Sequence, residues 1–260
     1  MPAKILTELA DSLTQARLSG QSRSQLSKDH KLTRADAYTI QEIGIEHRIQ
    51  RQEKFVGYKM GLTSEAKRKQ MNLDSPLYGV LTNKMQVQSG GTFHLQGSIH
   101  PKIEPEVAFL ITQDLRGNVS REQVIAACSS ICACMEILDS RYDQFKYFSM
   151  EDVIADNSSS SHFVIGPWLN DFKKLDLSNL KMKMSVNGES AQEGNSKDIS
   201  GDPIISVIQL CELLSERGRA LPAGSIVLAG AATAAVALEN GQKIELEVEG
   251  LAKLNVSIKI

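Results

Sequence analysis

The pattern of hydrophobic residues changes near Tyr78, and this change constrains the fold more than any other feature. Before it, apolar residues recur at helical spacing, which predicts one helix over residues 5–13 and another over 35–52 after the N-cap Thr33. After it, short β-rich runs alternate with turn signals, and Asn187 followed by glycine favours a tight hairpin between two of them. The chain therefore combines helices at its start with a longer β-rich part.

This organisation predicts an α+β fold. Residues 1–75 are expected to form a helical N-terminal portion, which also holds a strand over 55–62, a short helix over 64–71 and a polar surface loop over 19–30. Residues 76–260 are expected to form a mixed, β-rich domain. Because no repeat or low-complexity tail separates the two portions, we expect one compact unit.

Charge and cysteine usage exclude several classes of protein. The formal net charge is -2 at pH 7, so neither nucleic acid nor an anionic membrane is expected as the main partner. No apolar run approaches the roughly 20 residues of a membrane helix, and the N-terminus lacks the apolar core of a secretory signal. The four cysteines form no C-x-x-C pair, which argues against a zinc site. We expect a soluble protein of a reducing cytoplasm.

Two glutamates stand two residues apart in KIEPEVAFL, a run typical of a strand. Alternate strand residues share a face, so Glu104 and Glu106 are expected to point the same way, with about 7 Å between their Cα atoms. Glu136 lies in a second apolar run, CACMEILDSR. Carboxylates gathered on apolar segments repel one another unless a cation lies between them, and an all-oxygen site suits Mg²⁺ or Mn²⁺. Solvated glutamates on the outer face of a sheet are the alternative interpretation.

Other polar residues carry competing interpretations. Lys59 lies in the apolar strand of GYKMGLTS, where it points either inward to an anionic partner or outward. Asp156 begins a run with one asparagine and four serines, which either caps a helix or donates hydrogen bonds to a carboxylate. Arg141 and Asp139 are expected to pair and organise their loop. No Ser-His-Asp arrangement is identifiable, so the residues alone indicate a divalent-metal enzyme of unspecified reaction.

Six segments together carry a family resemblance. They are GYKMGLTSEAKRKQM, SPLYGVL, IHPKIEPEVAFL, EILDSRYDQFKY, VIADNSSS and LPAGSIVLAGAATAA, and they extend over nearly the whole chain. In this order they closely resemble the hydratase/decarboxylase branch of the fumarylacetoacetate hydrolase superfamily. The resemblance implies that residues 76–260 form a β-roll catalytic domain.

The functional residues of that family map onto this sequence one by one. Its E-x-E pair and its downstream glutamate, which hold Mg²⁺, fall on Glu104, Glu106 and Glu136, and Mn²⁺ is the other ion that such a site accepts. Its active-site lysine falls on Lys59, and the serine of its A-D-N-x-S loop falls on Ser159. The resemblance therefore implies a metal site beside a catalytic lysine.

Two sister enzymes of this branch act in succession in meta-cleavage degradation of aromatic compounds. One decarboxylates 2-oxo-3-hexenedioate, a small 2-oxo dicarboxylate, to a dienol, and the other, 2-oxopent-4-enoate hydratase, adds water to that dienol. Hydratases carry P-D-F-G where residues 76–79 read P-L-Y-G, and leucine cannot handle protons as the aspartate does. The decarboxylase resembles this chain more in KMGLTS, HPKIE and DSRY-x-x-F, although its usual ending GGITAAVPVAPGD is replaced by GAATAAVALENGQ. We therefore expect the decarboxylase.

The expected substrate contacts follow from that choice. Leu77 is expected to form an apolar wall near the departing carboxylate, which favours neutral CO₂ over a hydrated anion. Ser159, Ser158 and Arg141 are expected to contact substrate oxygens. Lys59 is expected to position an oxygen or move a proton.

Other functions and the partners stay open at this point. A hydratase is the first alternative, and acylpyruvate hydrolysis is more distant because it needs an activated water and a glutamate–histidine base. A non-catalytic subunit is the alternative from another class, since the resemblance implies association with the partner hydratase. It also implies a homo-oligomer. Failure to bind Mg²⁺ would favour the non-catalytic role.

Overall fold

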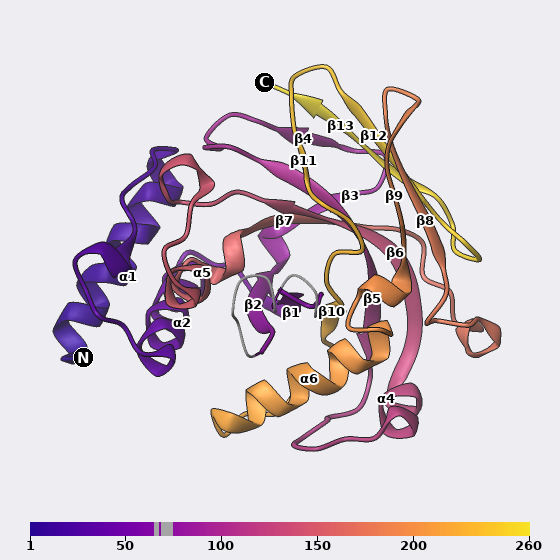
Figure 1. The fold of residues 1–260 in the computed structure, drawn as a ribbon, viewed down its shortest axis with the longest axis horizontal. Helices are drawn as coiled ribbons and strands as arrows, with labels where there is room; N and C mark the ends of the chain where they lie inside the picture. Colours follow the sequence, from indigo (N-terminus) through magenta and orange to yellow (C-terminus); the bar gives the residue numbers. More distant parts are fainter. Residues whose placement is uncertain (65–67, 69–74) are drawn as a thin grey trace.

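The computed structural model describes residues 1–64, 68 and 75–260, and it contains two β-sheets flanked by helices (Figure 1). The helices are α1 (Ala3–Ser19), α2 (Arg34–Gln50), α4 (Arg121–Ala127), α5 (Met150–Ala155) and α6 (Pro203–Glu216). The larger sheet has the spatial order β2 (Leu77–Thr82), β1 (Phe55–Gly61), β10 (Ile226–Leu228), β5 (Lys102–Ile111), β6 (Cys128–Leu138), β7 (Ser160–Ile165) and β3 (Gln86–Gln88), with β11 (Val236–Ala237) paired to β5. The smaller sheet has the order β4 (Thr92–His94), β13 (Leu254–Lys259), β12 (Lys243–Val248), β8 (Lys181–Val186) and β9 (Glu189–Asn195).

The larger sheet is curled, because the strands at its two edges follow each other directly in the chain and must therefore lie close together. Strands β2 and β3 stand at opposite ends of the pairing order, yet only the short 3₁₀ turn Asn83–Met85 connects them. Inside the curl, Leu81 from β2 packs in one buried cluster with Phe163 from β7 and Cys134 from β6. The sheet therefore has a concave inner face and a convex outer face.

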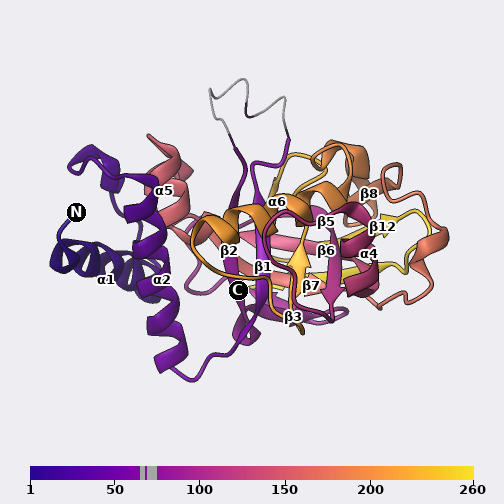
Figure 2. The same cartoon turned by 90° about the horizontal axis from the view of Figure 1, so that it is seen from below.

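The outer face carries the main hydrophobic core. Ile103, Val107 and Phe109 of β5 alternate with the residues of the inner face and are fully buried. They belong to the same core cluster as Val207 of α6 and Val256 of β13. Figure 2 shows α6 lying across the strands of the larger sheet, with α1, α2 and α5 grouped at one side. Helices and the smaller sheet thus cover the outer face, which leaves the inner face for the site.

The N-terminal helices form a separate layer against α5. Helix α2 begins at a capping box, in which Thr33 Oγ1 accepts a hydrogen bond from the Asp36 backbone and the Asp36 carboxylate accepts one from the Thr33 backbone. The connector before α2 was expected to be a surface loop, but Leu26 is buried and Ser27 donates two hydrogen bonds to Asp152 of α5. The connector therefore fastens the N-terminal layer to the rest of the molecule.

Most predicted elements are confirmed, and the α+β arrangement with them. The strand expected over 55–62 is β1, which pairs with β2 and β10 inside the larger sheet. Division at residue 75 stays a prediction, although β1 ties the first portion directly to the sheet. The helix expected over 64–71 lies largely outside the described residues. Among the residues that the structure describes, no helix is long and apolar enough to cross a membrane.

Candidate active site

Three glutamates meet on the inner face of the larger sheet. Glu104 and Glu106 share one face of β5, and Glu136 of β6 pairs directly with Glu104 across the ladder. One carboxylate oxygen from each of the three lies within 4.8 Å of the others. Glu106 and Glu136 are fully buried, so the alternative interpretation of solvated glutamates is wrong for these two. The predicted convergence of the three carboxylates is present in the structure.

Lys59 points inward from β1 and contacts this cluster. Its Nζ donates a hydrogen bond of 2.8 Å to Glu136 Oε2, and only 2% of the residue is exposed. Burial lowers the pKa of Lys59, but the carboxylates of Glu136, Glu104 and Glu106 outweigh it, so the pKa is raised. Ser160 Oγ donates 2.7 Å to the other oxygen, Glu136 Oε1. The two donors hold the Glu136 carboxylate in one orientation.

The carboxyl group of Glu106 is only partly satisfied by the described residues. Its Oε2 accepts a hydrogen bond of 2.8 Å from the Gly230 backbone, whereas its Oε1 is buried and has no hydrogen-bond partner among the described residues. Burial raises the pKa of Glu106, and the carboxylates of Glu136 and Glu104 raise it further. Three carboxylates beside one ammonium group leave a place for a cation, and their hard oxygen ligands fit Mg²⁺ or Mn²⁺.

Gly230 can approach Glu106 because it has no side chain. Its φ is +111°, in the region that glycine alone adopts readily, and a Cβ at this position would run into the side chain of Thr63. This backbone geometry explains the glycine in the GAATAA segment. The segment therefore supplies a backbone donor to the acidic cluster.

A cavity of about 180 Å³ opens beside Lys59 and Glu104. Its wall includes the loop after α5, where Asn157, Ser158 and Ser159 all have positive φ angles, at 49°, 54° and 57°. The Asn157 side chain fastens this loop to β2, because it accepts 2.8 Å from Val80 N and donates 3.0 Å to Val80 O. Ser158 and Ser159 line the cavity, as expected for residues that bind substrate.

Leu77 lies behind this wall. It is fully buried, and a Cβ built on Gly61 would lie 2.9 Å from Leu77 Cδ1 and 2.6 Å from Ser158 Oγ. Gly61 and Ser158 line the cavity, whereas Leu77 is not among its lining residues. Leu77 thus supports the wall from behind rather than forming its surface, which leaves its predicted substrate contact without support.

The expected side-chain pairing of Arg141 with Asp139 is wrong. The Arg141 guanidinium instead pairs with Asp156, and its Nη1 donates to the backbone carbonyls of Asp139 at 2.6 Å and Ser160 at 3.3 Å. The Asp139 carboxylate accepts hydrogen bonds from the backbone of Ile99 and His100. Arg141 is not among the residues that line the cavity, so its predicted substrate contact has no support either. Arg141 holds both ends of the loop that carries Ser158 and Ser159, the serine loop, through its contacts with Asp156 and Ser160.

Sequence reasoning missed two aromatic residues of the site. Phe145 and Tyr147 line the cavity, and the Tyr147 hydroxyl contacts Ser159 Oγ. Both belong to EILDSRYDQFKY. Phe145 has a positive φ of 56°, which is rare for phenylalanine, so the sequence does not predict the backbone turn that brings its ring to the cavity. Ser160 was also missed as the partner of Glu136. The only signal for it was its place within the run of four serines over residues 158–161, where β7 begins.

Comparisons with known proteins agree over the length of the chain. The protein-family profile described as "Fumarylacetoacetate (FAA) hydrolase C-terminal" matches residues 53–259. A 4-oxalocrotonate decarboxylase of Pseudomonas sp is 44% identical over 252 residues, 97% of each chain. A 2-hydroxyhexa-2,4-dienoate hydratase of Comamonas testosteroni is 33% identical over 94% of each. The solved structure of 4-oxalocrotonate decarboxylase from Pseudomonas putida G7, complexed with magnesium and adipate, has a TM-score of 0.96 at 34% identity, covering 99% of this chain and 98% of that one.

Proposed function

The chain belongs to the fumarylacetoacetate hydrolase family, and from this premise we propose that it decarboxylates 2-oxo-3-hexenedioate, also called 4-oxalocrotonate, with the help of Mg²⁺. The predicted family and its fold are confirmed, and the chain is an enzyme of the carboxy-lyase class. The products would be CO₂ and 2-hydroxypenta-2,4-dienoate, in meta-cleavage degradation of aromatic compounds.

One observation carries the proposal: three convergent carboxylates and a buried lysine at the side of a small cavity. Glu104, Glu106 and Glu136 would hold Mg²⁺, and the unpartnered Oε1 of Glu106 is the oxygen that most needs a cation. Bound there, the ion supplies Lewis acidity that polarises the 2-oxo group of the substrate. Mn²⁺ would suit the same ligands. Lys59 places an ammonium group beside the same carboxylates.

The electron flow defines what the protein must stabilise. The bond between C5 and the C6 carboxylate breaks, and its electron pair forms a double bond between C4 and C5. The alkene electrons then move between C2 and C3, and the 2-oxo oxygen takes up negative charge. Protonation of this oxygen gives the 2-hydroxydienoate. The Nζ of Lys59 is buried with its pKa raised, so it can hold positive charge near the developing oxyanion.

The cavity walls suit the two ends of such a substrate. Leu62, Leu138, Phe145 and Val153 contribute apolar surface, and an apolar surrounding favours the neutral CO₂ over the charged carboxylate that precedes it. Phe145 and its neighbours thus take the part that we expected of Leu77. The hydroxyls of Ser158, Ser159 and Tyr147 also line or adjoin the cavity and can donate hydrogen bonds to substrate oxygens.

The assembly and location of the enzyme are further parts of this proposal. We propose a homo-oligomer that can also associate with 2-oxopent-4-enoate hydratase, because the product dienol is the substrate of that hydratase. All four cysteines are buried and unpaired, which is usual in a reducing cytoplasm.

The direct test is CO₂ release from 2-oxo-3-hexenedioate by the purified protein, with Mg²⁺ and with a chelator. We expect release that depends on Mg²⁺, and restoration of activity when the metal is added back. Two other results would contradict the proposal. Consumption of 2-hydroxypenta-2,4-dienoate by hydration without CO₂ release would identify a hydratase, despite the leucine at position 77. Failure both to bind Mg²⁺ and to turn over either compound would indicate a non-catalytic subunit.

A further inference from the structure

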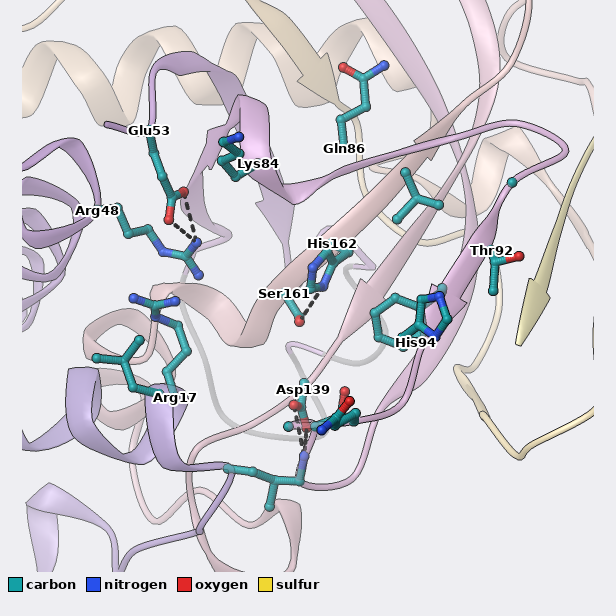
Figure 3. Close-up of a pocket in the computed structure, with 18 of the residues that line it drawn as sticks. Arg17, Arg48, Glu53, Lys84, Gln86, Thr92, His94, Asp139, Ser161 and His162 are labelled. Carbon is teal, nitrogen blue, oxygen red and sulfur yellow. Dashed lines mark hydrogen bonds and ion pairs between the residues drawn. The ribbon is translucent and has the colours of Figure 1, made fainter. Parts of the chain in front are cut away.

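A second cavity, of about 800 Å³, lies on the other face of the larger sheet (Figure 3). His162 pairs with Ile137, while the next pair along the ladder is Phe163 with Glu136. Neighbouring strand residues point to opposite faces, so His162 faces away from the acidic cluster. In Figure 3, the guanidinium groups of Arg17 and Arg48 lie near each other at one side of the cavity, and His162 lies nearer its middle. This cavity is therefore separate from the catalytic one.

The charges that line the second cavity are mainly positive. Its lining residues include four cationic side chains and two carboxylates: Arg17, Arg48, Lys84, Arg141, Glu53 and Asp139. Both carboxylates already have partners, since Glu53 pairs with Arg48 at 3.1 Å and Asp139 accepts hydrogen bonds from backbone amides. Arg141 pairs with Asp156. The uncompensated charges among these described residues belong to Arg17 and Lys84.

Arg17 is the residue that most needs a ligand. It is partly buried, its Nη2 atom has no access to solvent, and this atom has no hydrogen-bond partner among the described residues. Burial and the nearby charge of Arg48 lower the pKa of Arg17 to about 10. A guanidinium group binds carboxylate and phosphate groups through paired, charge-assisted hydrogen bonds. Arg17 and Arg48 both line the cavity, so an anion bound there beside the two guanidinium groups would offset their mutual repulsion.

We propose that this cavity is a second binding site, which takes a small organic anion carrying a carboxylate or phosphate group. The anionic group binds at Arg17 and Arg48. The body of the ligand lies over the ring of His162, which packs edge-on against Phe93 with 5.0 Å between ring centroids. The volume is within the range of pockets for metabolites, about 300–1000 Å³. The site needs no metal and does not depend on the proposed decarboxylation.

The test is calorimetric titration of the full chain with inorganic phosphate and, separately, with benzoate, in the presence of a chelator. We expect Arg17→Gln to weaken binding about tenfold or more, because a charged hydrogen-bond donor is lost. The matched control Arg116→Gln changes an exposed arginine outside the cavity and should bind as the unmodified chain does. Lys84→Gln, an exposed change that leaves the fold intact, should weaken binding roughly two- to fivefold.

A further variant separates the two cavities. Glu106→Gln alters the acidic cluster and should leave phosphate and benzoate binding unchanged. Binding of one probe alone would support the proposal and identify the anionic group. The proposal is overturned if neither probe binds at millimolar concentration, if Arg17→Gln binds as tightly as the unmodified chain, or if binding disappears only in Glu106→Gln. Sedimentation that shows self-association abolished by Arg17→Gln, with no probe binding, would instead assign the cavity to a second copy of this chain.

Discussion

Two cavities of opposite charge lie on opposite faces of one sheet. The catalytic cavity is small, about 180 Å³, and adjoins three carboxylates with a single lysine. The second cavity is larger, about 800 Å³, and carries guanidinium groups from α1 and α2. The larger of the two is not the one to which we assign the chemistry. The two sites differ in the sign of their charge, which is mainly negative beside the smaller cavity and mainly positive in the larger one.

The same physical rule explains both sites. A buried charge without a partner is expensive, so a fold that keeps one has a ligand of opposite sign to stabilise it. On the inner face the unpartnered atom is Glu106 Oε1, which calls for a cation. On the outer face the neighbouring guanidinium groups of Arg17 and Arg48 repel each other, and an anion would offset this repulsion. Changing the charge on one face should therefore leave ligand binding on the other face unaltered.

The largest effect is expected from Glu106→Gln. The amide keeps the shape but removes one of the three negative charges, so Mg²⁺ binding should be lost and decarboxylation should fall by roughly a thousandfold or more. Without metal, the variant should melt at a higher temperature than the unmodified chain, because the repulsion among buried carboxylates is reduced. Calorimetric Mg²⁺ titration and thermal melts with and without Mg²⁺ measure both effects.

Glu189→Gln is the matched control for that change, since Glu189 is exposed on β9, an end strand of the smaller sheet, whereas the cluster lies on the larger sheet. It should keep both activity and the Mg²⁺-dependent rise in melting temperature. If Glu106→Gln bound Mg²⁺ as tightly as the unmodified chain, the negative charge of the inner face would not be what binds the cation. The comparison between the two cavities would then lose its basis.

The next effect concerns the ammonium group of Lys59 beside the acidic cluster. Lys59→Met keeps the length of the side chain and removes its ammonium group, so kcat should fall roughly a hundredfold or more. Because Glu136 then loses a competing cation, Mg²⁺ should bind at least as tightly as before. Rate measurements at saturating Mg²⁺ separate these effects, with the exposed Lys181→Met as control. Full activity in Lys59→Met would contradict the catalytic role of the lysine.

The acidic half of the catalytic site could be predicted from the sequence for identifiable reasons. A strand has a period of two, so E-x-E places Glu104 and Glu106 on one face without knowledge of the fold. Glu136 and Lys59 were candidates because each lies in an apolar run, and the family resemblance then assigned their roles. Their positions beside the pair depend on strand pairings that a single sequence does not reveal. The strands themselves were predictable because their β-rich runs are bounded by turn signals.

The remaining parts of both cavities depend on contacts that sequence reasoning could not see. Phe145 and Tyr147 reach the catalytic cavity through a loop with positive φ angles. Arg141 pairs with Asp156 and not with Asp139, although Asp139 is closer in sequence. The Asp139 carboxylate instead accepts hydrogen bonds from the backbone amides of residues 99 and 100. The second cavity is lined by residues of α1, α2 and β7, and β7 begins more than 100 residues after α2 ends. Such long-range contacts have no local signal.

A moderate effect is expected where the two regions adjoin. Arg141 lines the second cavity, yet it donates hydrogen bonds to the carbonyls of Asp156 and Ser160, which lie on either side of Ser158 and Ser159 in the catalytic one. Arg141→Lys keeps the charge but loses the planar fork, so we expect decarboxylation to fall about tenfold, mainly in kcat. Mg²⁺ affinity should stay unchanged, because no metal ligand moves. Steady-state kinetics and Mg²⁺ titration check this, with Arg116→Lys as control.

An equal loss of Mg²⁺ affinity and activity in Arg141→Lys would show general disruption of the fold rather than displacement of the serine loop. Retention of full activity would show that the guanidinium contacts do not position these serines. Only the second result would show that the two regions act independently of each other.

The smallest effect tests the charge of the outer face through pH. Burial, with the charges of Arg48 and Arg17, lowers the pKa of His162 from 6.5 to about 4. The unfolded chain therefore binds a proton on this side chain at a higher pH than the folded chain does. Stability from His162 is complete above pH 6.5 and is lost as the pH falls toward 4, by about 1–3 kcal/mol. Denaturant unfolding at pH 7 and pH 4.5 should show a smaller loss of stability on acidification in His162→Gln than in the unmodified chain, whereas exposed His94→Gln should behave like the unmodified chain.

Phosphate bound beside Arg17 would offset the positive charge and raise the pKa of His162, so it should also reduce the loss of stability on acidification. Equal losses of stability in the unmodified chain, His162→Gln and His94→Gln would show that the second cavity does not oppose protonation of His162.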